Sequence, residues 1–239
     1  MRLIQNSAKS ITLLVCTTTV ALICASLAVW QYQRSQQKIT IIKKLDQLSQ
    51  QGVIPWYQLA SLPSDWLATG LKVSLSGEVS SQFWWLDNQV VNGRFGYDLI
   101  VAVKPNNSSR WWLVNLGWFA GSLNREQLPE VSLPQQLTLT ALLKVGNFTS
   151  FNLVSNDLEL RQGQLLQYIT PEFAASALQQ PFAPYILYAQ PDSALGEFHY
   201  QVINMSPDKH KAYALQWILL ALAAVVIGAV MYRKGSAHE

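Results

Sequence analysis

The chain has 239 residues, of which 50% are hydrophobic and only 13% carry a charge. An ordinary soluble domain carries charge on about a quarter of its residues, so the composition excludes that class. The net charge of +3 conceals an acidic middle: from Asp46 to Asp208 there are thirteen Asp and Glu against seven Lys and Arg, which argues against a nucleic-acid partner.

Residues 11–32 are predicted to be a first transmembrane helix, after an N-terminal segment of residues 1–10. No charge occurs from residue 10 to residue 33, a run long enough to cross the hydrocarbon core as a helix. The stretch also resembles a signal peptide, with Ser26-Leu27-Ala28 as a cleavage site. We favour a retained anchor, because the run exceeds the usual signal core and an aromatic and basic belt, residues 30–34, follows it.

Both cysteines, Cys16 and Cys24, lie in this first segment, eight residues apart and therefore about 12 Å apart along a helix. A disulfide requires Cα atoms within roughly 7 Å, so these two cannot pair with each other. The absence of further cysteines weakens a copper-carrier or thiol-oxidoreductase function.

Residues 33–70 are predicted to be a helical linker, since apolar residues recur at helical spacing over residues 38–51 and Pro55 then ends the helix. Residues 71–205 are predicted to form a β-rich domain. Alternating apolar and polar residues indicate strands at 73–79, 83–91, 97–103, 111–118, 137–145, 185–190 and 199–203. A tight turn is predicted at Asn92-Gly93, a hairpin at 104–109 and a helix at 171–178.

The fold class is therefore an α+β membrane protein with N- and C-terminal transmembrane helices around a mostly antiparallel β domain. The sequence does not decide whether this sheet closes into a barrel. Trp84-Trp85 and Trp111-Trp112 are each predicted to place one ring in the core and one outside, because neighbours on a strand face opposite ways.

Residues 206–232 are predicted to be the second transmembrane helix, followed by a tail at 233–239. Ser206 is suited to cap this helix and Pro207 to its first turn. The side chains of one stripe of this helix lie within about 40° of a line along it. The stripe begins with an imidazole, includes one indole, and has only small side chains further on. It consists of His210, Ala214, Trp217, Ala221, Ala224 and Gly228.

Small residues also repeat on the first helix, at Thr17, Ala21, Ala25 and Ala28, so the two helices are predicted to pack as a hairpin. Such a hairpin places Trp30 and His210 in the same leaflet and both termini on one side of the membrane. The basic residues on the flanks do not settle which side. Two readings of His210 stay open: an imidazole that presents a neutral nitrogen to a metal or cofactor, or a solvated residue at the start of a helix.

No catalytic constellation is apparent, so the protein is predicted not to be an enzyme. His199, in a predicted strand, is interpreted as a packing or surface residue rather than a ligand, and His238 as inert. A histidine without Cys or carboxylate partners at ligand spacing is weak support for a metal site, and no metal is predicted apart from a haem iron at His210 if haem binds.

Six motifs, in this order between two terminal spans, resemble the surfeit-locus family of cytochrome c oxidase assembly factors over nearly the whole chain. They are Leu27-Ala28-Val29-Trp30-Gln31-Tyr32-Gln33-Arg34, Gly77-Glu78-Val79, Leu86-Asp87-Asn88, Gly93-Arg94-Phe95-Gly96-Tyr97, Val114-Asn115-Leu116-Gly117-Trp118 and His210-Lys211-Ala212-Tyr213-Ala214-Leu215-Gln216-Trp217. The chain departs from the family pattern in having Leu116 where Arg is usual and Ala28 where Gly is usual.

The resemblance implies a multi-pass protein of the bacterial inner membrane with cytoplasmic ends and a periplasmic domain. It further implies maturation of the oxidase catalytic subunit, with that subunit, other assembly factors and membrane lipid as partners. Some bacterial members are linked to haem a through the histidine that corresponds to His210. Trp30 and Trp217 are then either interface anchors or the walls of an apolar slot for a porphyrin.

Two roles within oxidase assembly stay open, a haem a carrier and a haem-free scaffold. The residues expected to contact a partner protein are Arg94, Tyr213, Ala221, Ala224 and Gly228. The alternative from a different class is a membrane-anchored periplasmic binding or sensing domain unrelated to respiration.

Overall fold

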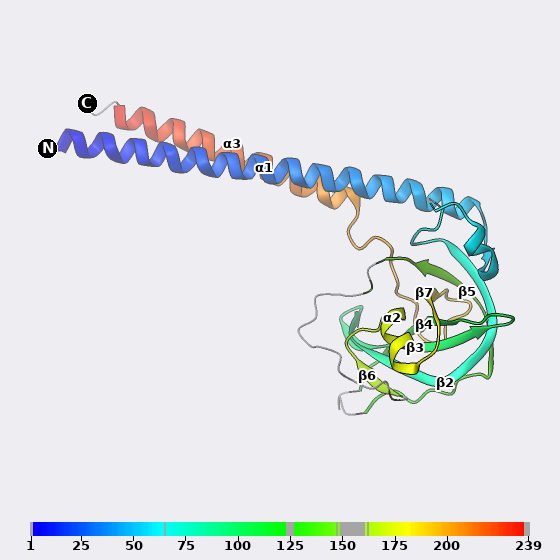
Figure 1. Cartoon of the computed structure of the whole chain (residues 1–239). Helices are drawn as coiled ribbons and strands as arrows, with labels where there is room; N and C mark the ends of the chain where they lie inside the picture. The colour runs from blue at the N-terminus through cyan, green and yellow to red at the C-terminus, as the bar shows by residue number, and fades with distance from the viewer. Residues whose placement is uncertain are drawn as a thin grey trace. The chain divides into compact units, whose positions relative to one another are not determined.

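The computed structural model describes residues 2–64, 66–122, 127–146, 148, 161 and 163–236 (Figure 1). It divides into two compact units, one of Met1–Lys44 with Ile203–Glu239 and the other of Leu45–Val202. The end of the predicted tail, including His238, lies outside the described residues.

The first unit is a pair of helices, α1 (Arg2–Gln50) and α3 (Pro207–Ser236), that run side by side in opposite directions (Figure 1). By length and composition both are candidates to cross a membrane, at Ile11–Gln50 and Pro207–Lys234. Ser206 caps α3 as predicted, its hydroxyl accepting from the backbone N–H of Lys209 at 3.4 Å.

The predicted helical extension over residues 38–51 is confirmed, because α1 continues to Gln50. Pro55 is not what ends it. The helix stops five residues earlier, just before Gly52, whose φ of +72° is readily adopted only by glycine. Leu48, near this end, is buried in the core of the second unit.

The second unit is a mixed sheet. Its elements are β1 (Ile54–Pro55), the 3-10 helix η1 (Trp56–Ser61), β2 (Lys72–Val91), β3 (Arg94–Pro105), β4 (Trp111–Ala120), β5 (Gln136–Lys144), β6 (Gln164–Leu166), α2 (Pro171–Leu178) and β7 (Phe182–Ala189). The sheet is less uniformly antiparallel than predicted, since β1 and β6 pair parallel with β2, and β7 pairs parallel with β4.

The strand pairings form a closed circuit. β2 pairs with β3, β3 with β4, β4 with β7, β7 with β5, and β5 returns to β2. Gly77 lies where β2 changes partners, opposite both Pro105 of β3 and Leu137 of β5. A Cβ at Gly77 would lie 2.2 Å from the carbonyl oxygen of Lys104, so only glycine fits there.

Two predictions about individual strands are wrong, and one strand was missed. The strands expected at 73–79 and 83–91 are one bent strand, β2, with register shifts between Val79 and Phe83 and between Leu86 and Gln89. Residues 199–203 do not form a strand. Instead, the preceding Glu197 makes an isolated bridge to Trp118. The short strand β6 was not predicted.

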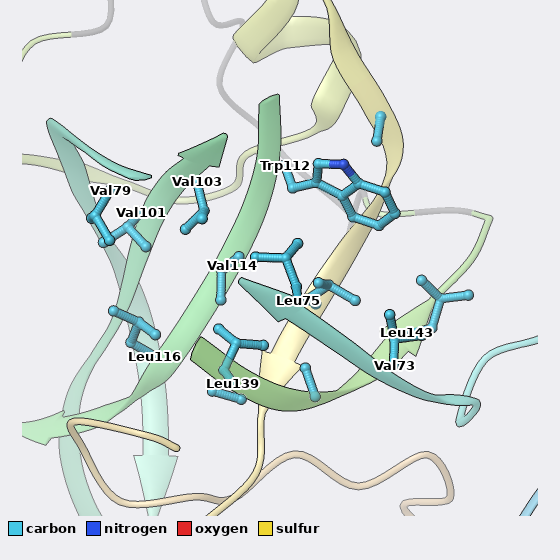
Figure 2. Close-up of a cluster of buried hydrophobic side chains, with 14 of the residues drawn as sticks. Val73, Leu75, Val79, Val101, Val103, Trp112, Val114, Leu116, Leu139 and Leu143 are labelled. Atoms are coloured by element: carbon cyan, nitrogen blue, oxygen red, sulfur yellow. The ribbon is translucent and has the colours of Figure 1, made fainter. Parts of the chain in front are cut away.

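Hydrophobic side chains are buried on both faces of the sheet. One cluster gathers alternate residues of the five circuit strands, among them Val114 and Trp112 (Figure 2). It also includes Trp85. The other includes Trp84 and lies with α2 and β6. Trp84 and Trp85 are both buried, so for this pair the prediction that one ring faces outward is wrong: Trp84 lies in a second cluster with Leu166 of β6 and Ala174 of α2. In the other pair Trp112 is buried and Trp111 is half-buried.

Candidate functional site

A seam of small and polar side chains joins α1 to α3. On each helix, six of the buried and half-buried residues recur at alternating intervals of four and three, the spacing of two helices that stay in contact. They are Thr17, Ala21, Cys24, Ala28, Gln31 and Ser35 on α1, and His210, Ala214, Trp217, Ala221, Ala224 and Gly228 on α3. The predicted stripe of α3 is thus confirmed as a helix-packing face, whereas on α1 Cys24, rather than the exposed Ala25, belongs to the seam.

The helices approach each other closely at Gly228. A Cβ there would lie 2.5 Å from the hydroxyl oxygen of Thr17, so the absence of a side chain is what lets α1 come this near. The Thr17 hydroxyl donates to its own helix, to the carbonyl oxygen of Leu13 at 3.0 Å, and needs no partner across the seam. Of the residues predicted to contact a partner protein, Ala224 and Gly228 are therefore buried against α1 of the same chain.

His210 lies at the other end of the seam and is only 8% exposed. Its Nδ1 is 2.8 Å from Oε1 of Gln31 on α1. Its Nε2 is buried and makes no hydrogen bond to any described residue. The reading of His210 as a solvated residue is therefore wrong: the imidazole is held inside the helix pair with one nitrogen free.

The two tryptophans predicted to flank His210 lie differently. Trp217 is half-buried on the same seam, two turns along α3. Trp30 is 46% exposed, and the guanidinium of Arg34 stacks over its ring at 5.6 Å from the centroid. Tyr213, the remaining predicted contact on α3, is 43% exposed.

An apolar groove of about 610 Å³ runs along one flank of the seam. Its α3 wall begins at Ala214, one turn after His210. It is lined by Ala21, Leu22, Ala25, Ala28, Val29 and Tyr32 of α1 and by Ala214, Ile218, Ala221, Leu222 and Val225 of α3.

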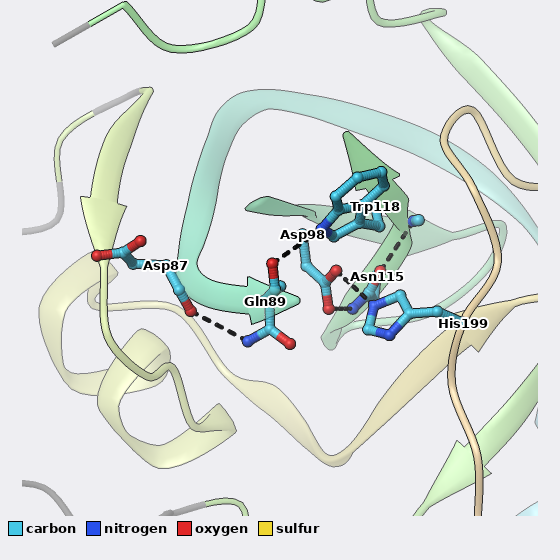
Figure 3. A network of polar contacts seen from close by, with 7 residues as sticks. Asp87, Gln89, Asp98, Asn115, Trp118 and His199 are labelled. Atoms are coloured by element: carbon cyan, nitrogen blue, oxygen red, sulfur yellow. Dashed lines mark hydrogen bonds and ion pairs between the residues drawn. The ribbon is translucent and has the colours of Figure 1, made fainter. Parts of the chain in front are cut away.

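A second polar cluster lies inside the β domain, around Asp98 (Figure 3). Asp98 is 3% exposed and accepts two hydrogen bonds, from Nδ2 of Asn115 at 2.7 Å and from Nε2 of His199 at 2.6 Å. Asn115 in turn accepts from the backbone N–H of Gly117 at 2.8 Å. His199 is therefore a partner of a buried carboxylate, and it lies outside any strand.

The surroundings of His199 raise its pKa from the ordinary 6.5. The main cause is the hydrogen bond to Asp98, the negative charges of Asp98 and Glu197 add to it, and burial opposes it. Next to this cluster the rings of Tyr188 and Tyr200 stack at 3.8 Å. Burial raises the pKa of Tyr200 to about 12, so this phenol stays neutral at physiological pH.

The stability of the β domain is expected to fall as the pH rises above neutrality. Because the folded-state pKa of His199 lies above its unfolded value, the ion pair stabilises the domain fully below about pH 6.5 and is lost as the pH rises through the folded pKa. The effect should be on the order of 1 kcal/mol, because the ring is partly exposed and solvent screens the pair.

Urea unfolding of the full chain in detergent, followed by tryptophan fluorescence at pH 6 and pH 8.5, measures this effect. Wild type should lose stability relative to His199→Gln between the two pH values. An identical pH dependence in both proteins would contradict the assignment.

Arg94 has a partner within its own chain. Its guanidinium pairs with Oε2 of Glu197 at 3.2 Å and lies over the ring of Trp118 at 5.2 Å from the centroid. The pair is exposed, so it contributes little to stability.

Gln31 is the site residue that the sequence did not single out. The only signal for it was its place in the spacing of the seam on α1. Among the described residues no group of three or more His, Cys, Asp or Glu side chains is arranged to hold a metal ion. The described chain therefore offers single ligands rather than a metal cluster.

A protein-family model described as the SURF1 family matches residues 18–222, which is most of the chain. The match begins within α1, spans the β domain and ends within α3. No curated protein matches the sequence.

Proposed function

The chain belongs to the SURF1 family, the surfeit-locus family associated with cytochrome oxidase assembly, and from this premise we propose that it holds haem a for the oxidase catalytic subunit. The observation that carries the proposal is the free Nε2 of His210, buried between α1 and α3. A buried polar atom without a partner costs about 1–3 kcal/mol, so its retention here calls for a ligand.

The donor set fits haem. An imidazole nitrogen is the protein ligand that haem iron takes in many haem proteins, and among the described residues His210 offers one without a competing metal-binding cluster. Haem a, when bound, would supply the iron to which this nitrogen donates its lone pair. Trp217 lies on the same face, and Trp30 is turned away from it, so Trp217 is the better candidate for contact with the porphyrin.

The apolar groove supports the same ligand. Haem a carries a long isoprenoid side chain, which requires an apolar channel, and the α3 wall of the groove starts one turn from His210. In this proposal these residues bind, orient and shield the ligand.

We further propose that the hairpin spans the bacterial inner membrane with the β domain in the periplasm. Family membership and the two candidate spans support this topology. Protease added to intact spheroplasts should then digest the domain, and digestion only in inverted vesicles would contradict it.

The partner surface we propose is formed by exposed residues outside the seam. Tyr213 on α3 is exposed and available to the catalytic subunit or to other assembly factors. Arg94 can bind a partner only if its ion pair with Glu197 breaks. A haem-free scaffold remains the second candidate, favoured by the close helix packing at Gly228, which alone would make the hairpin a rigid docking element.

Deleting the gene tests the assembly role. Membranes from the deletion strain should show reduced oxidase activity and less haem a in the catalytic subunit, both restored by the wild-type gene. Unchanged activity and haem content would reject assembly and leave a binding or sensing domain unrelated to respiration.

A further inference from the structure

Gln31 is an uncharged polar residue in the seam, and among the described residues its side chain is the one bonded to His210. We infer that Gln31 is a positioning residue, which fixes the imidazole of His210 so that Nε2 is the nitrogen free to bind iron. The inference rests on the proposed haem function and assigns to α1 a part in the site that His210 alone would not reveal.

The argument starts from the chemistry of an amide. The Oε1 of Gln31 accepts hydrogen bonds and cannot donate, so the ring nitrogen 2.8 Å from it, Nδ1, carries the proton. A neutral imidazole has one proton, and Nε2 therefore keeps its lone pair. This is the tautomer that ligates a metal through Nε2.

Burial makes the contact selective. His210 is 8% exposed, so water does not easily replace Gln31 as the partner of Nδ1. Ser35, the next seam position on α1, has a buried hydroxyl that bonds to no described residue and so does not compete for Nδ1.

The contact also joins residues 179 positions apart in the sequence. It therefore depends on the register of the two helices, which the close approach of Thr17 to Gly228 helps to fix. A residue that orients a ligating histidine in this way typically changes metal affinity by 10–100-fold when it is removed.

The test uses the full-length protein in detergent and four variants. Gln31→Leu removes the acceptor, and Gln31→Glu replaces it with a stronger one of similar shape. Gln33→Leu is the matched control, the same substitution at an exposed position two residues along α1. His210→Ala identifies the His210 signals and reports on the haem site itself.

Two readouts are needed. Nitrogen NMR of ¹⁵N-histidine-labelled protein without haem should show His210 protonated at Nδ1 in wild type and Gln33→Leu, and a mixture of tautomers in Gln31→Leu. Titration with haem a should show affinity reduced about 10–100-fold in Gln31→Leu and unchanged in Gln33→Leu. Gln31→Glu should keep the affinity and lower the midpoint potential of the iron, because a carboxylate makes the imidazole a stronger donor.

The failures are distinguishable. If wild type binds haem, His210→Ala does not, and Gln31→Leu matches wild type in tautomer and affinity, the role of Gln31 is overturned and the proposed function stands. If wild type binds no more haem than His210→Ala, the proposed function is overturned, and the role of Gln31 toward iron with it.

Discussion

Protein purified from haem-replete cells is expected to lose its haem when His210 is replaced by alanine. The free Nε2 of His210 is the ligand on which the proposal depends, and alanine offers no donor. Loss of an orienting neighbour already lowers metal affinity about 10–100-fold, so loss of the ligand itself should lower haem affinity by more than about 100-fold and leave little haem on the purified protein.

Absorbance spectra and the haem-to-protein ratio after purification measure the effect. His238→Ala is the matched control, since it also removes one imidazole but lies outside the seam sequence. Haem that stays at the wild-type ratio in His210→Ala would show that another residue holds it. Near-zero haem in the wild type as well as in His210→Ala would favour the haem-free scaffold.

Replacing Asp98 with alanine is expected to destabilise the β domain by about 3–5 kcal/mol at pH 7. The buried carboxylate accepts from both Asn115 and His199, so its removal leaves two donors without an acceptor in the interior (Figure 3). A domain of ordinary stability, about 5–15 kcal/mol, loses much of its margin by such a change.

Urea denaturation of the full chain, monitored by near-UV circular dichroism, gives the change in unfolding free energy. Asp192→Ala removes a carboxylate at an exposed position and should cost less than about 0.5 kcal/mol. If the two variants unfold at the same urea concentration, the Asp98 cluster is not a stabilising element.

The helices and most strands were predictable because their signals are local. An uncharged run of apolar residues indicates a membrane helix wherever it occurs, and alternation over a few residues indicates a strand. The positions of β3, β4, β5 and α2, and the continuation of α1, follow from such patterns.

The pairing of distant strands was not predictable. The parallel contact of β4 with β7 and the return of β5 to β2 leave no periodic trace in the sequence. The burial of Trp84 depends on α2 and β6, which cover its face from about 80 residues further along the chain. Alternation alone therefore predicted that one ring of the Trp84-Trp85 pair would lie outside, without saying which.

The same division holds at the site. His210 was recognisable because it stands on a stripe of small residues at the start of an apolar helix. Gln31 was not, because a glutamine beside Trp30 and Tyr32 equally suits a solvated membrane interface. Its contact with His210 exists only once two helices from opposite ends of the chain have found their register. The bond between Asp98 and His199 spans 101 positions and was hidden for the same reason.

The place of β7 between β4 and β5 has a consequence for the nascent polypeptide. A ribosome adding 5–20 residues per second completes Ala189 roughly 3–14 seconds after it completes Ala120. Throughout that interval the backbone N–H and C=O groups on the edge of β4 that later pairs with β7 have no partner strand. The side chains of β4 are among the most apolar of the sheet. During synthesis β4 therefore has an unpaired edge for several seconds, and pairing of this edge with another chain competes with completion of the fold.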